Sequence, residues 1–255
     1  EMVCHCLLVE SEAGLVLVET GLGTPSVTRP EQWLGRDFQL LTAPSRSAEQ
    51  TAVAQIERLG FDPSDVRHIV LTHLDLDHAG GLVDFPAATV HVYATELDSM
   101  RARRTRADKQ RYRQAHFAHG PRFRSYQVDG EPWFGFESVR ELEGLDGDVV
   151  IVPLAGHTRG HAGVAVRSGQ GWLLNAGDAY FWHGELDPAG PSMPPGLRLF
   201  EALVQTESRA RRENQERLRT LVAEHGDEVS VFCAHDPIEF HRLCEPVGGI
   251  PRTDG

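Results

Sequence analysis

The stretch Thr72-His73-Leu74-Asp75-Leu76-Asp77-His78-Ala79-Gly80-Gly81 decides how this chain is interpreted, because four potential metal ligands fall within six of its residues. It directly follows the apolar run His68-Ile69-Val70-Leu71, which predicts a buried strand. A strand that runs into a tight loop can turn alternate side chains toward one point, and Ala-Gly-Gly then lets the backbone turn at once into a helix. Histidine and carboxylate ligands suit a water-activating metal such as zinc, iron or manganese. The stretch therefore predicts the metal site of a hydrolase.

The composition indicates a globular protein and excludes some partners. Of the 255 residues, 40% are hydrophobic and 24% are charged, which is enough apolar material for a substantial core. The formal net charge of −12 argues against nucleic acid or an anionic membrane as the main partner, since both reward positive charge. No run of about 20 apolar residues is present, so no membrane-spanning segment is predicted.

The cysteines are expected to be reduced thiols. Four cysteines are too few for a disulfide scaffold in a chain of this length, and they predict reduced thiols in a cytoplasmic protein. Cys4 and Cys6 are predicted to point to opposite faces of a strand and not to share a metal.

Short apolar segments separated by turn residues predict an α/β protein with two halves of similar element order. Strands of the first half are expected at residues 3–9, 15–19, 68–71 and 89–93. Strands of the second half are expected at residues 149–153, 162–166, 171–175 and 228–233. One helix is expected over 47–60, closed by Gly60, and a long helix or two between 197 and 225.

A basic segment, residues 96–127, lies between the two halves, and its cationic side chains run from Arg101 to Arg124. One interpretation is a solvated helix whose arginines pair with the acidic surface. The other is a lid over the active site that presents cations to an anionic substrate.

Three more fragments resemble ligand loops, and each follows an expected strand. They are Gly156-His157-Thr158-Arg159-Gly160-His161, Asn175-Ala176-Gly177-Asp178-Ala179 and Cys233-Ala234-His235-Asp236-Pro237. Binding groups in α/β proteins cluster at strand ends, so these loops and the stretch around His73 are expected to converge at one edge of the sheets.

These fragments, taken in order with the opening hairpin Leu15–Gly21, resemble the metallo-β-lactamase superfamily over nearly the whole chain. The resemblance implies a single domain over residues 1–255 with the αββα sandwich of that superfamily. It also implies a site for two divalent metals at one edge of the central sheets.

The resemblance assigns a role to each ligand candidate. One metal would be held by His73, Asp75 and His157, and the other by Asp77, His78 and His235, with Asp178 bridging the two. His161 matches a structural position, while His116, His119 and His183 have no motif support. Two residues depart from the family: Asp75 stands where histidine is common, which favours iron or manganese beside the expected zinc, and Glu19 replaces an aspartate that supports the ligand loops.

The implied reaction is hydrolysis by a hydroxide held between the metals, with a lactone or another carboxylic ester as the expected substrate. Asp77 would orient the water and pass on its proton, and Tyr180 would donate a hydrogen bond to the reacting carbonyl. The alternatives are a phosphodiesterase, a di-iron oxidoreductase suggested by Asp75, and a metal-free binding protein on the same fold. The expected partner is a small-molecule substrate, and a homodimer is left open.

Overall fold

The computed structural model describes residues 2–145 and 147–244. In this part of the chain, strands form two five-stranded sheets and a two-stranded ribbon, β6-β7. The first sheet, ordered β1-β2-β3-β4-β5, consists of Leu7–Ser11, Gly14–Val18, Val66–Val70, Thr89–Tyr93 and Arg122–Tyr126. The second, ordered β12-β11-β10-β9-β8, consists of Val229–Phe232, Gly171–Asn175, Ala162–Ser168, Val149–Pro153 and Arg140–Glu141. The ribbon pairs Gly130–Trp133 with Phe136–Ser138.

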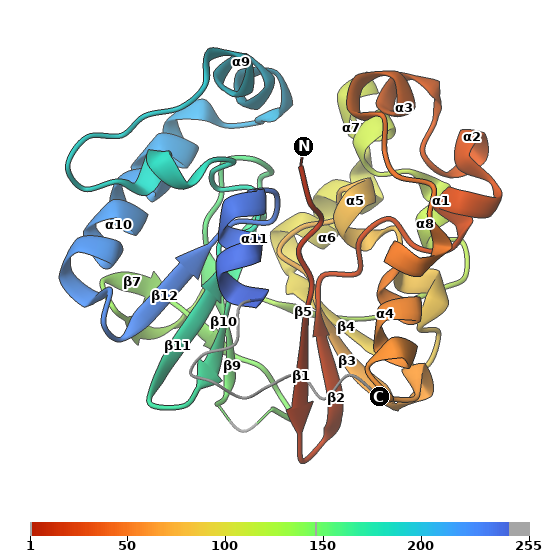
Figure 1. Cartoon of the computed structure of the whole chain (residues 1–255), viewed down its shortest axis with the longest axis horizontal. Helices are drawn as coiled ribbons and strands as arrows, with labels where there is room; N and C mark the ends of the chain where they lie inside the picture. Colours follow the sequence, from red (N-terminus) through yellow and green to blue (C-terminus); the bar gives the residue numbers. More distant parts are fainter. Residues whose placement is uncertain (1, 146, 245–255) are drawn as a thin grey trace.

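The helices of the described residues flank these sheets (Figure 1). Those of the first half are α1 (Pro25–Thr28), α2 (Pro30–Trp33), α3 (Arg36–Thr42), α4 (Ala52–Arg58), α5 (Leu76–Ala79), α6 (Ala94–Ala102), α7 (Arg106–Arg111) and α8 (Gln114–Phe117). Those of the second half are α9 (Pro195–Val204), α10 (Ser208–His225) and α11 (Pro237–Cys244). Short 3-10 turns span Ala48–Gln50, Pro63–Asp65, Leu82–Asp84 and His183–Leu186.

The two sheets pack face to face, and helices cover their outer faces. Along β2, Val16 and Val18 belong to the apolar cluster between the sheets, whereas Leu15 and Leu17 belong to the cluster under the helices. This division follows from the two-residue period of a strand, and it explains why β2 is apolar throughout. On the far side, Leu218 of α10 belongs to the cluster that covers the second sheet. The layers are helices, sheet, sheet and helices, which confirms the predicted αββα sandwich.

The strand directions place several loops at one edge. Both β9 and β11 run antiparallel to β10, and β12 runs parallel to β11, so the carboxyl ends of β9, β11 and β12 lie together. The chain leaves β3 at the same end of the molecule and enters α5 there (Figure 1). The topology therefore places the ligand loops together at this edge of the sheets.

The opening strand is shorter than predicted. It begins at Leu7, because the preceding residues pair with the last ligand loop of the second half instead of extending the first sheet. The backbone N–H of Val3 donates to His235 O (3.3 Å) and that of His5 donates to Ala234 O (2.9 Å). The amino-terminal segment thus ties the two halves together beside the ligand loops.

Each of the two predicted helical segments contains more than one element. The segment 47–60 has a 3-10 turn before α4, since the Thr51 hydroxyl accepts a hydrogen bond from Ala54 N and starts a new helix there. The segment 197–225 forms two helices, with α9 ending at Val204 and α10 starting at Ser208. Among the described residues, none of the helices combines the length and apolar character that a membrane span requires.

The basic segment 96–127 is not one helix. It contains most of α6, all of α7 and α8, and the edge strand β5 of the first sheet. Strand β5 was not predicted, because its alternating arginines, Arg122 and Arg124, resemble a continuation of the charged segment. The single-domain prediction also includes residues 245–255, which lie outside the described residues.

Candidate metal centre

The predicted ligand loops converge at the edge where the strands end. His73 follows β3, and Asp77 and His78 lie on α5. His157, Asp178 and His235 follow β9, β11 and β12, respectively. In the first half-site, His73 Nε2 lies 3.4 Å from Asp75 Oδ2, and His157 Nε2 lies 3.0 Å from the same oxygen.

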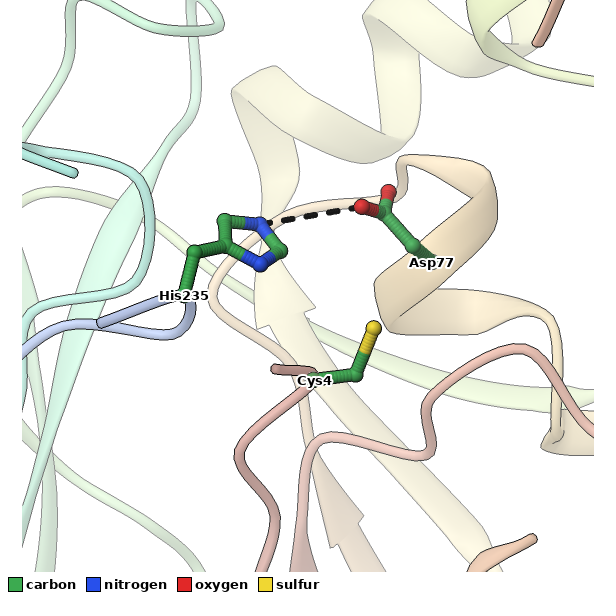
Figure 2. Close-up of side chains that lie close together, drawn as sticks. All are labelled: Cys4, Asp77 and His235. Carbon is green, nitrogen blue, oxygen red and sulfur yellow. Dashed lines mark ion pairs between the residues drawn. The ribbon is translucent and has the colours of Figure 1, made fainter. Parts of the chain in front are cut away.

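The second half-site consists of His78, Asp77 and His235. His235 Nε2 lies 3.6 Å from Asp77 Oδ2, and Figure 2 marks this pair by a dashed line. His78 Nε2 lies 3.9 Å from the other oxygen of Asp77. Each half-site therefore contains the ligand set that was predicted for one of the two metals.

Asp178 lies between the two half-sites. Its Oδ2 faces the first, 3.4 Å from His157 Nε2 and 3.8 Å from His73 Nε2. Its Oδ1 faces the second, 3.3 Å from His78 Nε2 and 3.1 Å from His235 Nε2. One carboxylate that offers one oxygen to each side can bridge two cations.

Hydrogen bonds on the far side of each ring orient three of the imidazoles. His73 Nδ1 contacts Thr72 Oγ1 at 2.9 Å, His78 Nδ1 contacts Glu19 Oε2 at 2.9 Å, and His235 Nδ1 contacts the Val3 carbonyl at 2.7 Å. An acceptor at Nδ1 keeps Nε2 unprotonated and directed at a metal. Glu19 also accepts from the Thr72 backbone N–H at 2.8 Å, so the glutamate supports the ligand loops as predicted for this position.

The donor atoms that face the centre fit bound cations. His73 Nε2, His78 Nε2, Asp75 Oδ1 and Asp178 Oδ1 are buried and have no hydrogen-bond partner in the structure. Buried polar atoms are normally paired, so unpaired donor atoms on four of the ligand candidates indicate that these residues bind a further group. Imidazole nitrogens and carboxylate oxygens are suitable donors for zinc, iron or manganese. The residues present therefore fit a pair of divalent metals.

Arg111, which the sequence analysis named only as part of the basic segment, reaches the first half-site from α7. Its Nη1 donates to Asp75 Oδ2 at 2.6 Å and lies 3.0 Å from His157 Nε2. Its Nη2 donates to the Val204 carbonyl at the end of α9. Although burial raises it, the pKa of the Asp75 carboxyl is held well below its usual range, foremost by Arg111. A guanidinium therefore lies against the two ligands that a metal in this half-site would share.

Cys4 lies beside the second half-site. One donor atom each from Cys4, Asp77 and His235 lie within 4.8 Å of one another, and Figure 2 shows the thiol pointing toward the space between the other two. The prediction that Cys4 and Cys6 face opposite sides was wrong: a Cβ on Gly21 would lie 3.9 Å from both Cys4 Cβ and Cys6 Sγ. Residues two apart in an extended segment share a face, so the positions of Cys4 and Cys6 in the sequence already predict a shared face.

Tyr180 does not face the centre. Its side chain is fully buried, and its hydroxyl donates to the Glu239 carboxylate at 2.9 and 3.1 Å. The predicted catalytic role of Tyr180 therefore does not fit the structure. Motif order alone placed it near Asp178, whereas the backbone turns its ring into the core of the second half.

Three histidines outside the ligand set have partners within the fold. His161 Nε2 accepts from the Asp178 backbone N–H at 2.9 Å, and His161 Nδ1 donates to the Leu154 carbonyl at 3.0 Å, so both its nitrogens are engaged. His116 lies 2.9 Å from the Trp33 carbonyl through Nε2. His183 Nδ1 lies 2.8 Å from Asp236, the neighbour of His235.

Glu96 on α6 joins two ligand loops, a role that was not predicted. Its fully buried carboxylate accepts from Leu74 N at 3.1 Å, Thr158 Oγ1 at 2.7 Å and Gly160 N at 3.2 Å. These bonds hold the loop of His73 against the loop of His157. A lone glutamate after a strand carries no sequence signal for such a role.

Comparisons with known proteins agree with this architecture. Residues 1–222 match the model of the Metallo-beta-lactamase superfamily. A Mycobacterium tuberculosis protein named "Probable metallo-hydrolase" is 43% identical over 236 residues, covering 92% of this chain and 75% of the relative. The N-acyl homoserine lactonase AttM of Agrobacterium fabrum is 28% identical over 237 residues, covering 90% of this chain and 80% of the relative.

Two solved structures share the fold. An N-acyl homoserine lactone hydrolase, described with N-hexanoyl-L-homoserine at its catalytic metal center, has a TM-score of 0.67 at 21% identity and covers 97% of this chain and 86% of the other. AidC, described as a dizinc quorum-quenching lactonase, has a TM-score of 0.59 at 20% identity and covers 92% of this chain and 73% of the other.

Proposed function

This chain belongs to the metallo-beta-lactamase superfamily, and we propose that it is a metallo-hydrolase that opens an acyl-bearing lactone or cleaves a related carboxylic ester. The observation that carries the proposal is the bridging position of Asp178, with Oδ1 3.1 Å from His235 Nε2 and Oδ2 3.4 Å from His157 Nε2. A centre built around one shared carboxylate suits chemistry in which two cations act on one substrate.

The chain supplies the remaining functions of the site. A bound metal pair provides a Lewis acid for the carbonyl and an activated water. Asp77 is the ligand candidate with the most exposed side chain, at 21%, and its Oδ2 lies 3.6 Å from His235 Nε2. We assign to its carboxylate the proton taken from the attacking water, which it then gives to the alkoxide oxygen released when the acyl–oxygen bond breaks.

An apolar wall beside the centre supports a substrate with an acyl chain. The Phe181 ring stacks on His235 with centroids 5.5 Å apart and meets Phe200 of α9 edge-on at 5.6 Å. The same helix exposes Leu199 and Leu203, at 64% and 74%. Helix α9 stands at the same end of the molecule as α5 (Figure 1). Relatives named N-acyl homoserine lactonase point to the same substrate class.

We propose zinc as the main metal, with manganese or iron competing at the first half-site. Four imidazoles suit zinc, whereas Asp75 replaces one softer nitrogen with a hard oxygen at the first half-site. Elemental analysis of protein purified without added metal measures both identity and stoichiometry.

The test is a substrate panel assayed with zinc-, manganese- and iron-loaded protein. It compares N-acyl homoserine lactones of short and long chain, simple lactones, aryl esters, a thioester and a phosphodiester. Mass spectrometry separates the two ways of cleaving the first class: ring opening adds one water to the intact molecule, while amide cleavage releases a free fatty acid. We expect ring opening, with the largest kcat/KM for the longer chains.

Two variants make the panel specific to the centre. Asp178→Ala removes the bridging carboxylate and is expected to abolish turnover and to reduce bound metal. Asp98→Asn alters an exposed carboxylate on α6 and controls for the loss of charge. Turnover of the phosphodiester alone, or of no compound by protein with two metals bound, would overturn the proposal.

A further inference from the structure

The amino-terminal segment positions Cys4 beside the centre. Hydrogen bonds from Val3 N and His5 N to the loop of His235 fix the backbone on both sides of Cys4. The His5 ring packs against Phe232 and Phe240, with centroids 4.4 and 4.9 Å away. Because neighbouring side chains of an extended segment point to opposite faces, burial of His5 in the core turns Cys4 toward the ligands.

The second half-site, where Cys4 lies, holds donor atoms that lack a hydrogen-bond partner. Cys4 Sγ, an Asp77 oxygen and a His235 nitrogen lie within 4.8 Å of one another (Figure 2). His78 Nε2 and Asp178 Oδ1 lie 3.3 Å apart at the same half-site, and both are buried without a hydrogen-bond partner. His78 and Asp178 expose only 1% and 4% of their surface. These two atoms indicate a ligand at this half-site independently of the cysteine.

We propose that Cys4 is a thiolate ligand of the second half-site. The inference rests on the metal centre of the proposed function and adds a donor that the predicted ligand set lacks. Donors that share one zinc at its usual bond lengths lie about 3.5 Å apart, and the donor atoms of Cys4, Asp77 and His235 lie within 4.8 Å of one another, so a shift of about 1 Å brings the thiol into range. On binding, the sulfur–hydrogen bond breaks, the sulfur lone pair binds the cation, and the proton leaves to solvent.

A thiolate makes the two half-sites chemically unequal. With Cys4, the second half-site adds a soft sulfur donor to His78, His235 and the carboxylate of Asp77. The first half-site combines His73 and His157 with the hard carboxylate of Asp75. Soft donors select zinc over manganese, and carboxylates discriminate less. The second half-site is therefore the one that retains zinc when both metals are offered.

Cobalt substitution of the full chain tests the ligand without any substrate. Metal-free protein receives two equivalents of Co²⁺, and its absorption spectrum reports thiolate ligation by a near-ultraviolet sulfur-to-cobalt charge-transfer band. We expect the band in the unaltered protein, its loss in Cys4→Ser, and its retention in the controls Cys6→Ser and Cys244→Ser. The visible cobalt bands and the bound stoichiometry show separately whether the metal centre has formed.

A second readout needs no variant. Cys4 is exposed in the structure, so prolonged alkylation followed by peptide mass mapping should modify it in metal-free protein. Added zinc should protect Cys4 and leave the labelling of the exposed Cys244 unchanged. Absence of the charge-transfer band in protein with two cobalt ions, its persistence in Cys4→Ser, or unprotected Cys4 in zinc-loaded protein would each overturn the inference. Failure of the lactone panel with an intact charge-transfer band would count against the proposed substrate and not against Cys4.

Discussion

Replacing Arg111 by methionine should strengthen metal binding at the first half-site. The guanidinium donates to Asp75 Oδ2 at 2.6 Å and lies 3.0 Å from His157 Nε2, so it competes with a cation for both ligands. The side chains of Arg111 and Asp75 are only 16% and 15% exposed, so solvent screens their attraction weakly. A hydrogen bond between charged groups contributes about 1.5–3 kcal/mol. Removing this competitor should therefore tighten the weaker metal site by about 10- to 100-fold.

The same variant should destabilise the metal-free protein. Without Arg111, the Asp75 carboxylate loses its cationic partner, and breaking a buried ion pair costs about 3–5 kcal/mol. Metal binding restores a positive charge at Asp75, so the rise in Tm on metal loading should be larger in Arg111→Met than in the unaltered chain.

Chelator competition measures the affinity of each site, and thermal unfolding with and without zinc measures the coupling to stability. Lys109→Met is the matched control, because it removes one exposed cation from the same helix. Unchanged or weaker binding at the first half-site in Arg111→Met would refute the competition. Arg111 would then support the metal ligands instead of opposing the metal.

Three further predictions concern residues outside the ligand set. Burial lowers the pKa of His91 to about 3 and that of His116 to about 4, so the folded protein keeps both neutral while the unfolded chain protonates them below about pH 6.5. Protonation of the unfolded chain therefore lowers the free energy of unfolding on acidification, by about 2 kcal/mol for each histidine at pH 5, and has no effect well above pH 6.5. Urea unfolding of metal-free protein at pH 8 and pH 5 measures this difference, which should be about 2 kcal/mol smaller in His91→Gln. Glu96→Gln should lower the free energy of unfolding by about 1–3 kcal/mol and weaken metal binding, because an amide cannot accept all the hydrogen bonds that the carboxylate accepts; chemical unfolding and metal titration measure the two effects. Tyr180→Phe should leave kcat unchanged and lower the free energy of unfolding by about 1–2 kcal/mol, because Glu239 loses one of its two donors; a large fall in kcat with unchanged stability would restore a catalytic role for Tyr180.

The sequence predicted the core of the fold because its strands are locally unambiguous. Apolar segments such as 149–153 and 171–175 appear as β9 and β11 with the bounds expected for them. Prediction failed where local signals conflict with distant contacts. Residues 3–6 have strand-like composition, but their hydrogen bonds go to the loop of His235, far along the chain. The arginine-rich edge strand β5 was missed for a related reason, since pairing with β4 outweighs its polar composition.

The residues of the candidate site also fall into two groups, those that local motifs predict and those that distant contacts place. The histidines and aspartates of short motifs can be recognised as ligand candidates from the sequence, because their spacing reflects one local turn. Cys4, Arg111 and Glu96 reach the centre through tertiary packing, and no motif places them there. Conversely, Tyr180 lies two residues from Asp178 in the chain and still faces the core. Proximity in sequence indicates a shared loop and does not determine where a side chain points.

The two half-sites neutralise their carboxylates differently, and this predicts an order of metal loading. In the first half-site the Arg111 guanidinium already lies against Asp75, so an incoming metal must displace a cation. In the second, no cationic lysine or arginine side chain among the described residues is paired with Asp77, and Cys4 adds a further donor. Zinc should therefore fill the second half-site first, and calorimetric titration should resolve two steps of unequal affinity. Arg111→Met should bring the weaker step closer to the stronger one, and Cys4→Ser should do the same by weakening the stronger step. Two equivalent sites in the unaltered protein would contradict both assignments at once, because each of them predicts the same inequality from a different residue.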